Sequence, residues 1–155
     1  YVLSEGKNVN IEIVENGFAN YYFPSGKDVY YNDFREAWNV CIGKAENLCK
    51  KSDDACSSCI KLEEFNYRSD EVVFSNQCNF KCNLTGWEIK DEGRKIFVFP
   101  KFSLDSSSEV TIKTGNGTNT EKTLFWRGET YFWTQTGDTL FLRDKEGELV
   151  LWENF

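Results

Sequence analysis

The 155-residue sequence contains no histidine and no methionine, and it has only two prolines. The absence of histidine excludes the commonest general base near neutral pH, histidine-dependent catalytic triads and histidine metal ligands. No apolar stretch approaches the roughly 18 residues that a membrane span needs, and no stretch has the composition of a signal peptide. Without methionine, a chain that starts at Tyr1-Val2-Leu3 is expected to be a processed product or an excised part of something longer. Any targeting segment is then expected upstream.

Positive charge is also scarce. The formal net charge is −7 and the isoelectric point is about 4.7. Residues 1–62 carry 7 basic and 9 acidic side chains, and residues 63–155 carry 11 and 16. Neither part is basic, which argues against a broad surface for polyphosphate. Hydrophobic residues make up 40% of the chain and aromatic residues 16%, so there is ample material for a core and global disorder is excluded.

Residues 84–150 consist of short strand-like runs separated by tight turns. Apolar side chains occur at every second position, the period that turns one face of a strand inward. These alternating pairs are Trp87/Ile89, Phe97/Phe99, Leu140/Leu142 and Leu149/Leu151. Gly147 ends a four-residue turn that begins at Asp144, where glycine suits the positive φ of a hairpin. With residues 60–65 and 72–74 as the first strands, the pattern predicts a mainly β, two-layer sandwich.

Five separated blocks of this stretch follow one another in a characteristic order. The blocks are Leu84–Asp91, Phe97–Pro100, Gly115–Thr120, Leu124–Trp126 and Gly137–Val150. Their order and composition resemble a lamin-tail domain over roughly Ile60 to Phe155. The resemblance implies an immunoglobulin-like β-sandwich. It implies little about chemistry, because such sandwiches host many unrelated functions.

A short helical segment is expected before the sandwich. Residues 9–16 are predicted to form a helix that Asn8 or Asn10 caps and that Gly17 ends. Residues 32–49 give the clearest helical pattern, with a capping-box start at Asp33. Its continuous apolar stripe consists of Phe34, Ala37, Trp38, Cys41, Ile42, Ala45, Leu48 and Cys49. Such a stripe must be buried, and the candidates are the first helix and a sheet upstream of this chain.

The N-terminal segment carries a second resemblance. The matching residues are Gly6-Lys7, Val9-Asn10, Val14, Gly17, Ala19, Tyr22, Tyr31, Phe34 and Ala37. In this order they resemble the C-terminal third of a staphylococcal-nuclease-like (thermonuclease) domain. In that family the calcium-binding acidic residues and the two catalytic arginines precede this point, so no catalytic residue carries over. The helix also lacks the family's usual Gly-x-Trp ending and runs into a cysteine-rich segment.

Six cysteines are present, an even count that predicts disulfides in a secreted or extracytoplasmic protein. They are Cys41, Cys49, Cys56, Cys59, Cys78 and Cys82. We favour a Cys78–Cys82 pair, with three pairings open for the other four. One alternative is a zinc site made by Cys41, Cys49, Cys56 and Cys59. The other alternative is reduced thiols or a redox-active Cys56–Cys59 motif. Glycosylation sequons at Asn83 and Asn116 are compatible with export.

The best candidate for a binding surface is the aromatic segment around Arg127. The favoured interpretation of these aromatics is core and edge packing; the alternative is that Trp126, Arg127, Tyr131 and Trp133 form a platform for carbohydrate, for bases or for a peptide. Carboxylate pairs such as Asp91/Glu92 suggest calcium ligands or an acid–base pair, but neighbours on a strand point to opposite faces.

Asp138, in a Gly-Asp-Thr sequence, is expected to cap a turn. We predict no catalytic residue, no metal ligand and no cofactor in this chain. Calcium is possible only in an upstream catalytic part.

Three segments are therefore predicted. Residues 1–50 are a helical remnant of a nuclease-like domain, residues 51–59 a cysteine-rich connector, and residues 60–155 a lamin-tail-like β-sandwich. The favoured function is the non-catalytic C-terminal part of a secreted nuclease-like protein, with the sandwich serving stability, targeting or binding. Its expected partner is the upstream segment, through which nucleic acid would bind.

Two alternative functions stay open. The chain could be a segment of an active calcium-dependent nucleic-acid phosphodiesterase whose catalytic residues lie upstream. It could instead be a stand-alone binding module that uses the Trp126–Trp133 aromatic loop.

Overall fold

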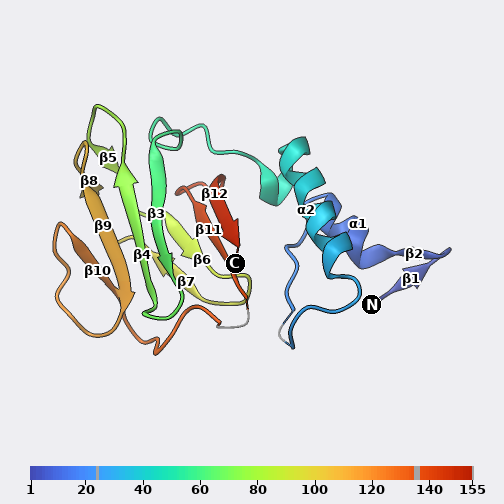
Figure 1. Ribbon diagram of the computed structural model, residues 1–155. Coiled ribbons are helices and arrows are strands. Elements are labelled where there is room, and N and C mark those ends of the chain that lie inside the picture. The colour runs from blue at the N-terminus through green and yellow to red at the C-terminus, as the bar shows by residue number, and fades with distance from the viewer. Residues whose placement is uncertain (24, 135–136, 155) are drawn as a thin grey trace. The chain divides into compact units, whose positions relative to one another are not determined.

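The computed structural model describes residues 1–23, 25–134 and 137–154 (Figure 1). The chain divides into two compact units, Tyr1–Lys51 and Ser52–Phe155. The second unit is made of β-strands, and the helices lie in the first. This confirms the predicted fold class, a β-sandwich preceded by a short helical segment. Phe155, the last residue of the predicted sandwich, lies outside the described residues.

The first unit opens with a small hairpin and a short helix. Strand β1 (Leu3–Ser4) pairs with β2 (Lys7–Asn8), and α1 spans Val9–Glu15. The Asn8 side chain accepts a hydrogen bond from the backbone N–H of Asn10 and caps the helix, as predicted. Gly17 has a φ of 69°, and the N–H groups of Gly17 and Phe18 donate to the carbonyls of Val14 and Ile13. This pattern is a glycine-terminated helix end, which confirms the predicted stop.

Helix α2 differs from its prediction at both ends. It spans Tyr31–Lys44, and a separate 3₁₀ turn, η1, covers Asn47–Cys49. The predicted capping box is wrong, because the N-cap is Tyr30 and its side chain makes no capping bond. The predicted extension to Cys49 is also wrong. A continuous helix would separate Cys41 from Cys49 by about 12 Å, whereas a disulfide holds their Cα atoms 5.8 Å apart.

Most of the apolar stripe that remains helical is buried as expected, and Ile42 is half-buried. Phe34, Ala37, Trp38 and Cys41 are buried in α2, and the Phe34 ring packs 5.6 Å from that of Phe23. Other apolar side chains of this unit stay at the surface: Tyr1, Val2, Leu3, Ile13, Phe18, Tyr22 and Val29.

The second unit contains two four-stranded sheets and a short two-stranded one. The first has the order β10-β9-β4-β3, with β3 Ile60–Asn66, β4 Glu71–Asn76, β9 Glu109–Thr114 and β10 Thr123–Trp126. The second has the order β12-β11-β6-β7, with β6 Glu88–Lys90, β7 Ile96–Val98, β11 Thr139–Arg143 and β12 Leu149–Asn154. The third pairs β5 (Cys82–Asn83) with β8 (Ser103–Leu104). Strands β9 and β10 run parallel, whereas the other neighbouring strands of the two larger sheets run antiparallel (Figure 1).

The sandwich core forms between the inward faces of the two larger sheets. Val72 and Phe74 of β4 meet residues such as Ile89 and Leu140 of the opposite sheet in one buried cluster. Each large apolar side chain buried in this way contributes roughly 1.5–3 kcal/mol. The alternating residues Trp87, Ile89, Phe97, Phe99, Leu140, Leu142 and Leu149 are buried, and Leu151 packs against the cluster.

The C-terminal hairpin has the predicted turn. Leu142 of β11 pairs with Leu151 of β12, and Gly147 has a φ of 80°. Among the described residues, neither helix is long and apolar enough to cross a membrane.

Candidate functional site

The aromatic segment around Arg127 is divided between the core and the surface. Trp126 ends β10 with only 5% of its surface exposed, and its ring stacks on that of Phe132 at a centroid distance of 4.5 Å. Trp133 is 2% exposed and packs edge-on against Phe132 and Phe65. The Asp70 carboxylate accepts hydrogen bonds from the N–H groups of Phe132 and Trp133, which fixes this segment over the sheet.

Only Arg127 and Tyr131 of the four predicted binding residues are exposed. Arg127 donates to the carbonyl of Gly117 at 2.9 Å. Tyr131 lies under the Lys95 ammonium, 3.2 Å from its ring centroid, in a cation–π contact. The indoles of Trp126 and Trp133 pack in the core, as the core-packing interpretation expects, so they do not line an exposed platform. Binding by Arg127 and Tyr131 stays a prediction.

A buried acidic cluster joins the end of β6 to the start of β11. Asp138 accepts hydrogen bonds from the N–H groups of Thr139, Thr134 and Glu92 at 2.8, 3.0 and 3.3 Å. The expectation that Asp138 caps a turn is confirmed. Asp91 accepts from the N–H of Lys95 at 2.9 Å. Both carboxylates therefore bind the protein's own backbone.

The electrostatics of this cluster follow from its burial. Burial raises the pKa of Asp91 to about 6, helped by the nearby Asp138 carboxylate and opposed by backbone hydrogen bonds. Burial also raises the pKa of Asp138. A carboxyl with a pKa near 6 has acid–base capacity near neutral pH, but here its hydrogen bonds serve a turn.

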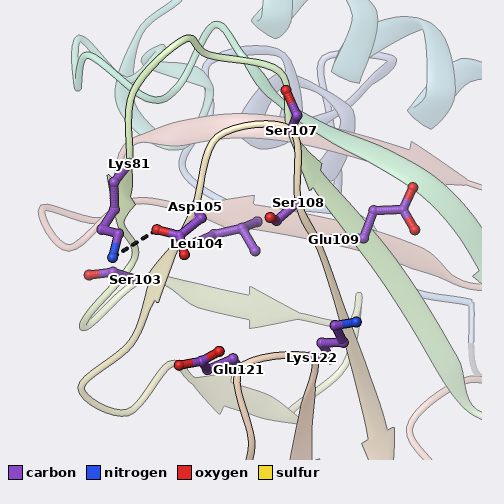
Figure 2. Close-up of a pocket in the computed structure, with 9 residues that line it drawn as sticks. All are labelled: Lys81, Ser103, Leu104, Asp105, Ser107, Ser108, Glu109, Glu121 and Lys122. Carbon is purple, nitrogen blue, oxygen red and sulfur yellow. Dashed lines mark ion pairs between the residues drawn. The ribbon is translucent and has the colours of Figure 1, made fainter.

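A polar pocket of about 420 Å³ lies between β5, β8 and the loop before β10 (Figure 2). Its lining residues are Lys81, Ser103, Leu104, Asp105, Ser107, Ser108, Glu109, Glu121 and Lys122. Lys81 and Asp105 form an ion pair at 2.7 Å, drawn as a dashed line in Figure 2. Three carboxylates and two ammonium groups make this a polar, weakly acidic surface depression. Such a depression offers partners to a hydrogen-bonding ligand.

All six cysteines form disulfides in three pairs. The bonded pairs are Cys41–Cys49, Cys56–Cys82 and Cys59–Cys78. The predicted Cys78–Cys82 pair is wrong, although the two sulfurs are only 3.7 Å apart. The N–H of Gln77 donates to the carbonyl of Cys59, which sets Cys59 beside Cys78 and leaves Cys82 facing Cys56.

The four cysteines of the alternative zinc site predicted from the sequence are divided between the two units. Cys41 and Cys49 belong to the first unit, whereas Cys56 and Cys59 belong to the second and are bonded to other partners.

Two polar residues with a central place in the sandwich were missed from the sequence. Asn76 is fully buried, donates to the carbonyls of Phe80 and Leu104, and accepts from the N–H of Cys78. The signal was an asparagine two residues after the apolar run Val72–Phe74, where a buried polar side chain must find partners.

Asp144 is the second missed residue. It is buried and accepts hydrogen bonds from the N–H groups of Glu146 and Glu148 and from the hydroxyl of Ser52. The turn was recognised from sequence, but the contact with Ser52, 92 residues earlier, carries no local signal.

In the comparison with protein families, the chain matches the model described as Lamin Tail Domain over residues 54–154. No curated protein matches the chain. The family match confirms the lamin-tail part of the sequence-based prediction. The nuclease-like part stays a prediction.

Proposed function

The chain belongs to the lamin tail domain family, and we propose that its sandwich is the accessory, non-catalytic module of a secreted nuclease-like protein. One observation carries this proposal: the buried polar side chains of the sandwich are engaged by its own backbone. Buried Asn76, Asp138 and Asp144, together with the partly buried Asp70, hold loops of the sandwich through hydrogen bonds to main-chain groups. A catalytic centre requires polar groups that are free to meet a substrate. Here the same residue types stabilise the fold, as expected of a binding or structural module.

The nuclease-like parent is supported by the N-terminal unit. Its sequence resembles the end of a thermonuclease domain, and seven of the eleven large hydrophobic side chains that are exposed in the described residues lie in this unit. Apolar surface of that amount is what a segment packed against further protein would present. In this proposal the upstream part binds calcium and nucleic acid and carries out any phosphodiester hydrolysis.

Export is supported by the cysteines and the sequons. Three disulfides are characteristic of oxidising compartments. Asn83 and Asn116, the acceptors of the two sequons, are both exposed. We therefore place the protein outside the cytoplasm in this proposal.

The exposed side of the Arg127–Tyr131 loop is the part of the predicted binding surface that the proposal keeps. Arg127→Ala and Tyr131→Ala would be compared with Lys61→Ala, an exposed change on β3, in binding to a glycan array and to oligothymidylate. We expect tenfold or greater loss for the first two and no change for the control, with unfolding temperatures unaltered. Binding that is equal in all three variants would remove this surface from the proposal.

The decisive test of the parent protein is its intact mass in the native source, read with an antibody to the sandwich. We expect a species heavier than 18.0 kDa by about 10 kDa or more, enough for an upstream nuclease core. A species of 18.0 kDa and nothing larger would overturn the proposal and make this chain the working unit.

A further inference from the structure

Four of the six cysteines converge in the sandwich. Cys56 and Cys59 form a Cys-x-x-Cys motif just before β3, and Cys78 and Cys82 form a Cys-x-x-x-Cys motif between β4 and β5. The sulfurs of Cys56, Cys78 and Cys82 lie within 4.8 Å of one another, and Cys59 is bonded to Cys78. Two short cysteine motifs that bring four sulfurs to one point are the arrangement of structural zinc sites.

The distances suit a zinc ion. A tetrahedral site with Zn–S bonds of about 2.3 Å places its sulfurs roughly 3.8 Å apart. Cys78 and Cys82, which are not bonded to each other, already have a sulfur separation of 3.7 Å. After reduction the two bonded pairs need to open by about 2 Å, which side-chain rotation supplies. Cys59 is only half-buried, so it leaves an entry path for the ion.

The backbone around the four cysteines is held by bonds that do not involve sulfur. Ile60 of β3 pairs with Asn76 of β4, and the N–H of Gln77 donates to the carbonyl of Cys59 at 2.9 Å. The Asn76 side chain accepts from the N–H of Cys78. Cys82 belongs to β5, where it pairs with Leu104 of β8. The scaffold therefore keeps the four side chains together when the disulfides are absent.

We propose that Cys56, Cys59, Cys78 and Cys82 bind one Zn²⁺ ion as a tetrathiolate when their two disulfides are reduced. A dithiol or phosphine reductant supplies two electrons per disulfide, and each disulfide takes up two protons to give two thiols. Zinc then displaces the four thiol protons and forms four Zn–S bonds. A small-molecule disulfide, which accepts two electrons per bond formed and is reduced to two thiols, restores the two protein disulfides and releases the ion. The cluster would thus cross-link the same loops with zinc under reducing conditions and with disulfides under oxidising ones.

Cys41 and Cys49 provide an internal control. They form a single disulfide in the other unit, and the described residues bring no third cysteine into that pair. Two thiols alone make a poor zinc site, because structural sites use four protein ligands. The proposal therefore separates the six cysteines into four that bind metal and two that do not.

The test uses the full chain, reduced with a phosphine under argon and titrated with Zn²⁺, followed by brief alkylation with iodoacetamide and peptide mass spectrometry. We expect one zinc per chain, protection of Cys56, Cys59, Cys78 and Cys82, and alkylation of Cys41 and Cys49. Zinc should also raise the unfolding temperature of the reduced chain, and Co²⁺ should give the visible absorption of a tetrahedral thiolate complex. The oxidised chain should bind no zinc.

Paired serine variants sharpen the result. The Cys41→Ser/Cys49→Ser variant should keep full zinc binding, whereas Cys78→Ser/Cys82→Ser should bind at least tenfold more weakly. If the second variant does not fold, the protection pattern of the wild-type chain decides alone. Absence of zinc from the reduced chain, or protection that includes Cys41 and Cys49, would overturn the proposal.

Discussion

The two units of this chain use apolar side chains in opposite ways. In the Ser52–Phe155 unit the aromatic residues of the sequence pattern are buried, including Trp87, Phe97, Phe99 and Trp126. In the Tyr1–Lys51 unit, which is half as long, Phe18 is 70% exposed and six other large apolar side chains also lie at the surface. The sandwich therefore buries the apolar side chains of its own sequence pattern, whereas the N-terminal unit leaves seven large apolar side chains exposed.

The two units also differ in how polar groups stabilise them. Buried Asn76, Asp138 and Asp144 hold the sandwich loops. The N-terminal unit depends on helix ends and on the Cys41–Cys49 disulfide.

The largest effect is expected for Trp126→Ala, which should lower the free energy of unfolding of the sandwich by about 4 kcal/mol, because it removes a buried ring that stacks on Phe132. Phe18→Ala is the matched aromatic change in the other unit and should cost less than about 0.5 kcal/mol, because that ring is exposed. Urea denaturation followed by circular dichroism measures both. Equal losses of stability would contradict the difference between the two units.

Asn76→Ala should destabilise the sandwich by about 3 kcal/mol, because two carbonyls and one N–H lose their partner inside the protein. The control is Asn79→Ala, three residues away and exposed, with an expected cost below about 0.5 kcal/mol. Both stability changes are obtained from urea denaturation midpoints, provided that the dependence of the unfolding free energy on urea concentration is unchanged. A cost below 1 kcal/mol for Asn76→Ala would show that this side chain does not hold its loops.

Removal of the Cys41–Cys49 disulfide by paired alanine substitutions should cost about 2.5 kcal/mol, the chain-entropy value for a loop of eight residues. The loss should be confined to the N-terminal unit. Hydrogen exchange read by mass spectrometry should show faster exchange in peptides from α2 and η1 and unchanged exchange in β4 and β11. Faster exchange in both units alike would contradict the division.

Asp91→Asn should have the smallest effect, and one that depends on pH. In the folded protein the pKa of Asp91 is raised to about 6. The neutral carboxyl therefore contributes fully to the free energy of unfolding below the ordinary pKa of 3.8, and this contribution is lost as the pH rises through 6. Asparagine keeps an acceptor for Lys95 without the charge. The variant should therefore match the wild type near pH 3.5 and unfold about 4 °C higher at pH 7.

Thermal unfolding across this pH range, with exposed Asp105→Asn as the control, measures the effect. A variant that is less stable than the wild type at pH 7 would show that the Asp91 charge is favourable, contrary to the raised pKa.

The strand periodicity predicted the sandwich well because each local pattern agreed with the global fold. Leu140, Leu142, Leu149 and Leu151 alternate, and a glycine-containing turn lies between them, so the hairpin was determined by neighbours in sequence. Helix α1 was predicted for the same reason, since Asn8 and Gly17 mark its ends locally.

The failures arose where distant residues decide the structure. The apolar stripe continues to Cys49, but the disulfide to Cys41 requires the chain to turn at Ala45, which adopts a left-handed conformation. Likewise, the four sandwich cysteines lie so close together that spacing could not choose the partners of Cys78 and Cys82.

The sequence could not decide between the two interpretations of the Trp126–Trp133 segment for a related reason. Composition alone does not distinguish aromatic side chains of an exposed platform from those of a core. Here the Asp70 carboxylate accepts hydrogen bonds from the N–H groups of Phe132 and Trp133, and both side chains point into the core. Asp70 lies more than 60 residues away in sequence, so no local pattern contains this information. Arg127 and Tyr131 were correctly expected near the surface of the same loop.

The most direct test of the account is a cleavage assay on the purified 155-residue chain. Single-stranded DNA, duplex DNA and RNA would be incubated with it, with and without calcium, and the products read on denaturing gels. We expect no cleavage under any of these conditions, because the buried polar groups of the sandwich are hydrogen-bonded to its own backbone. Cleavage that co-elutes with the chain through two different columns would contradict it and place a catalytic centre within these residues.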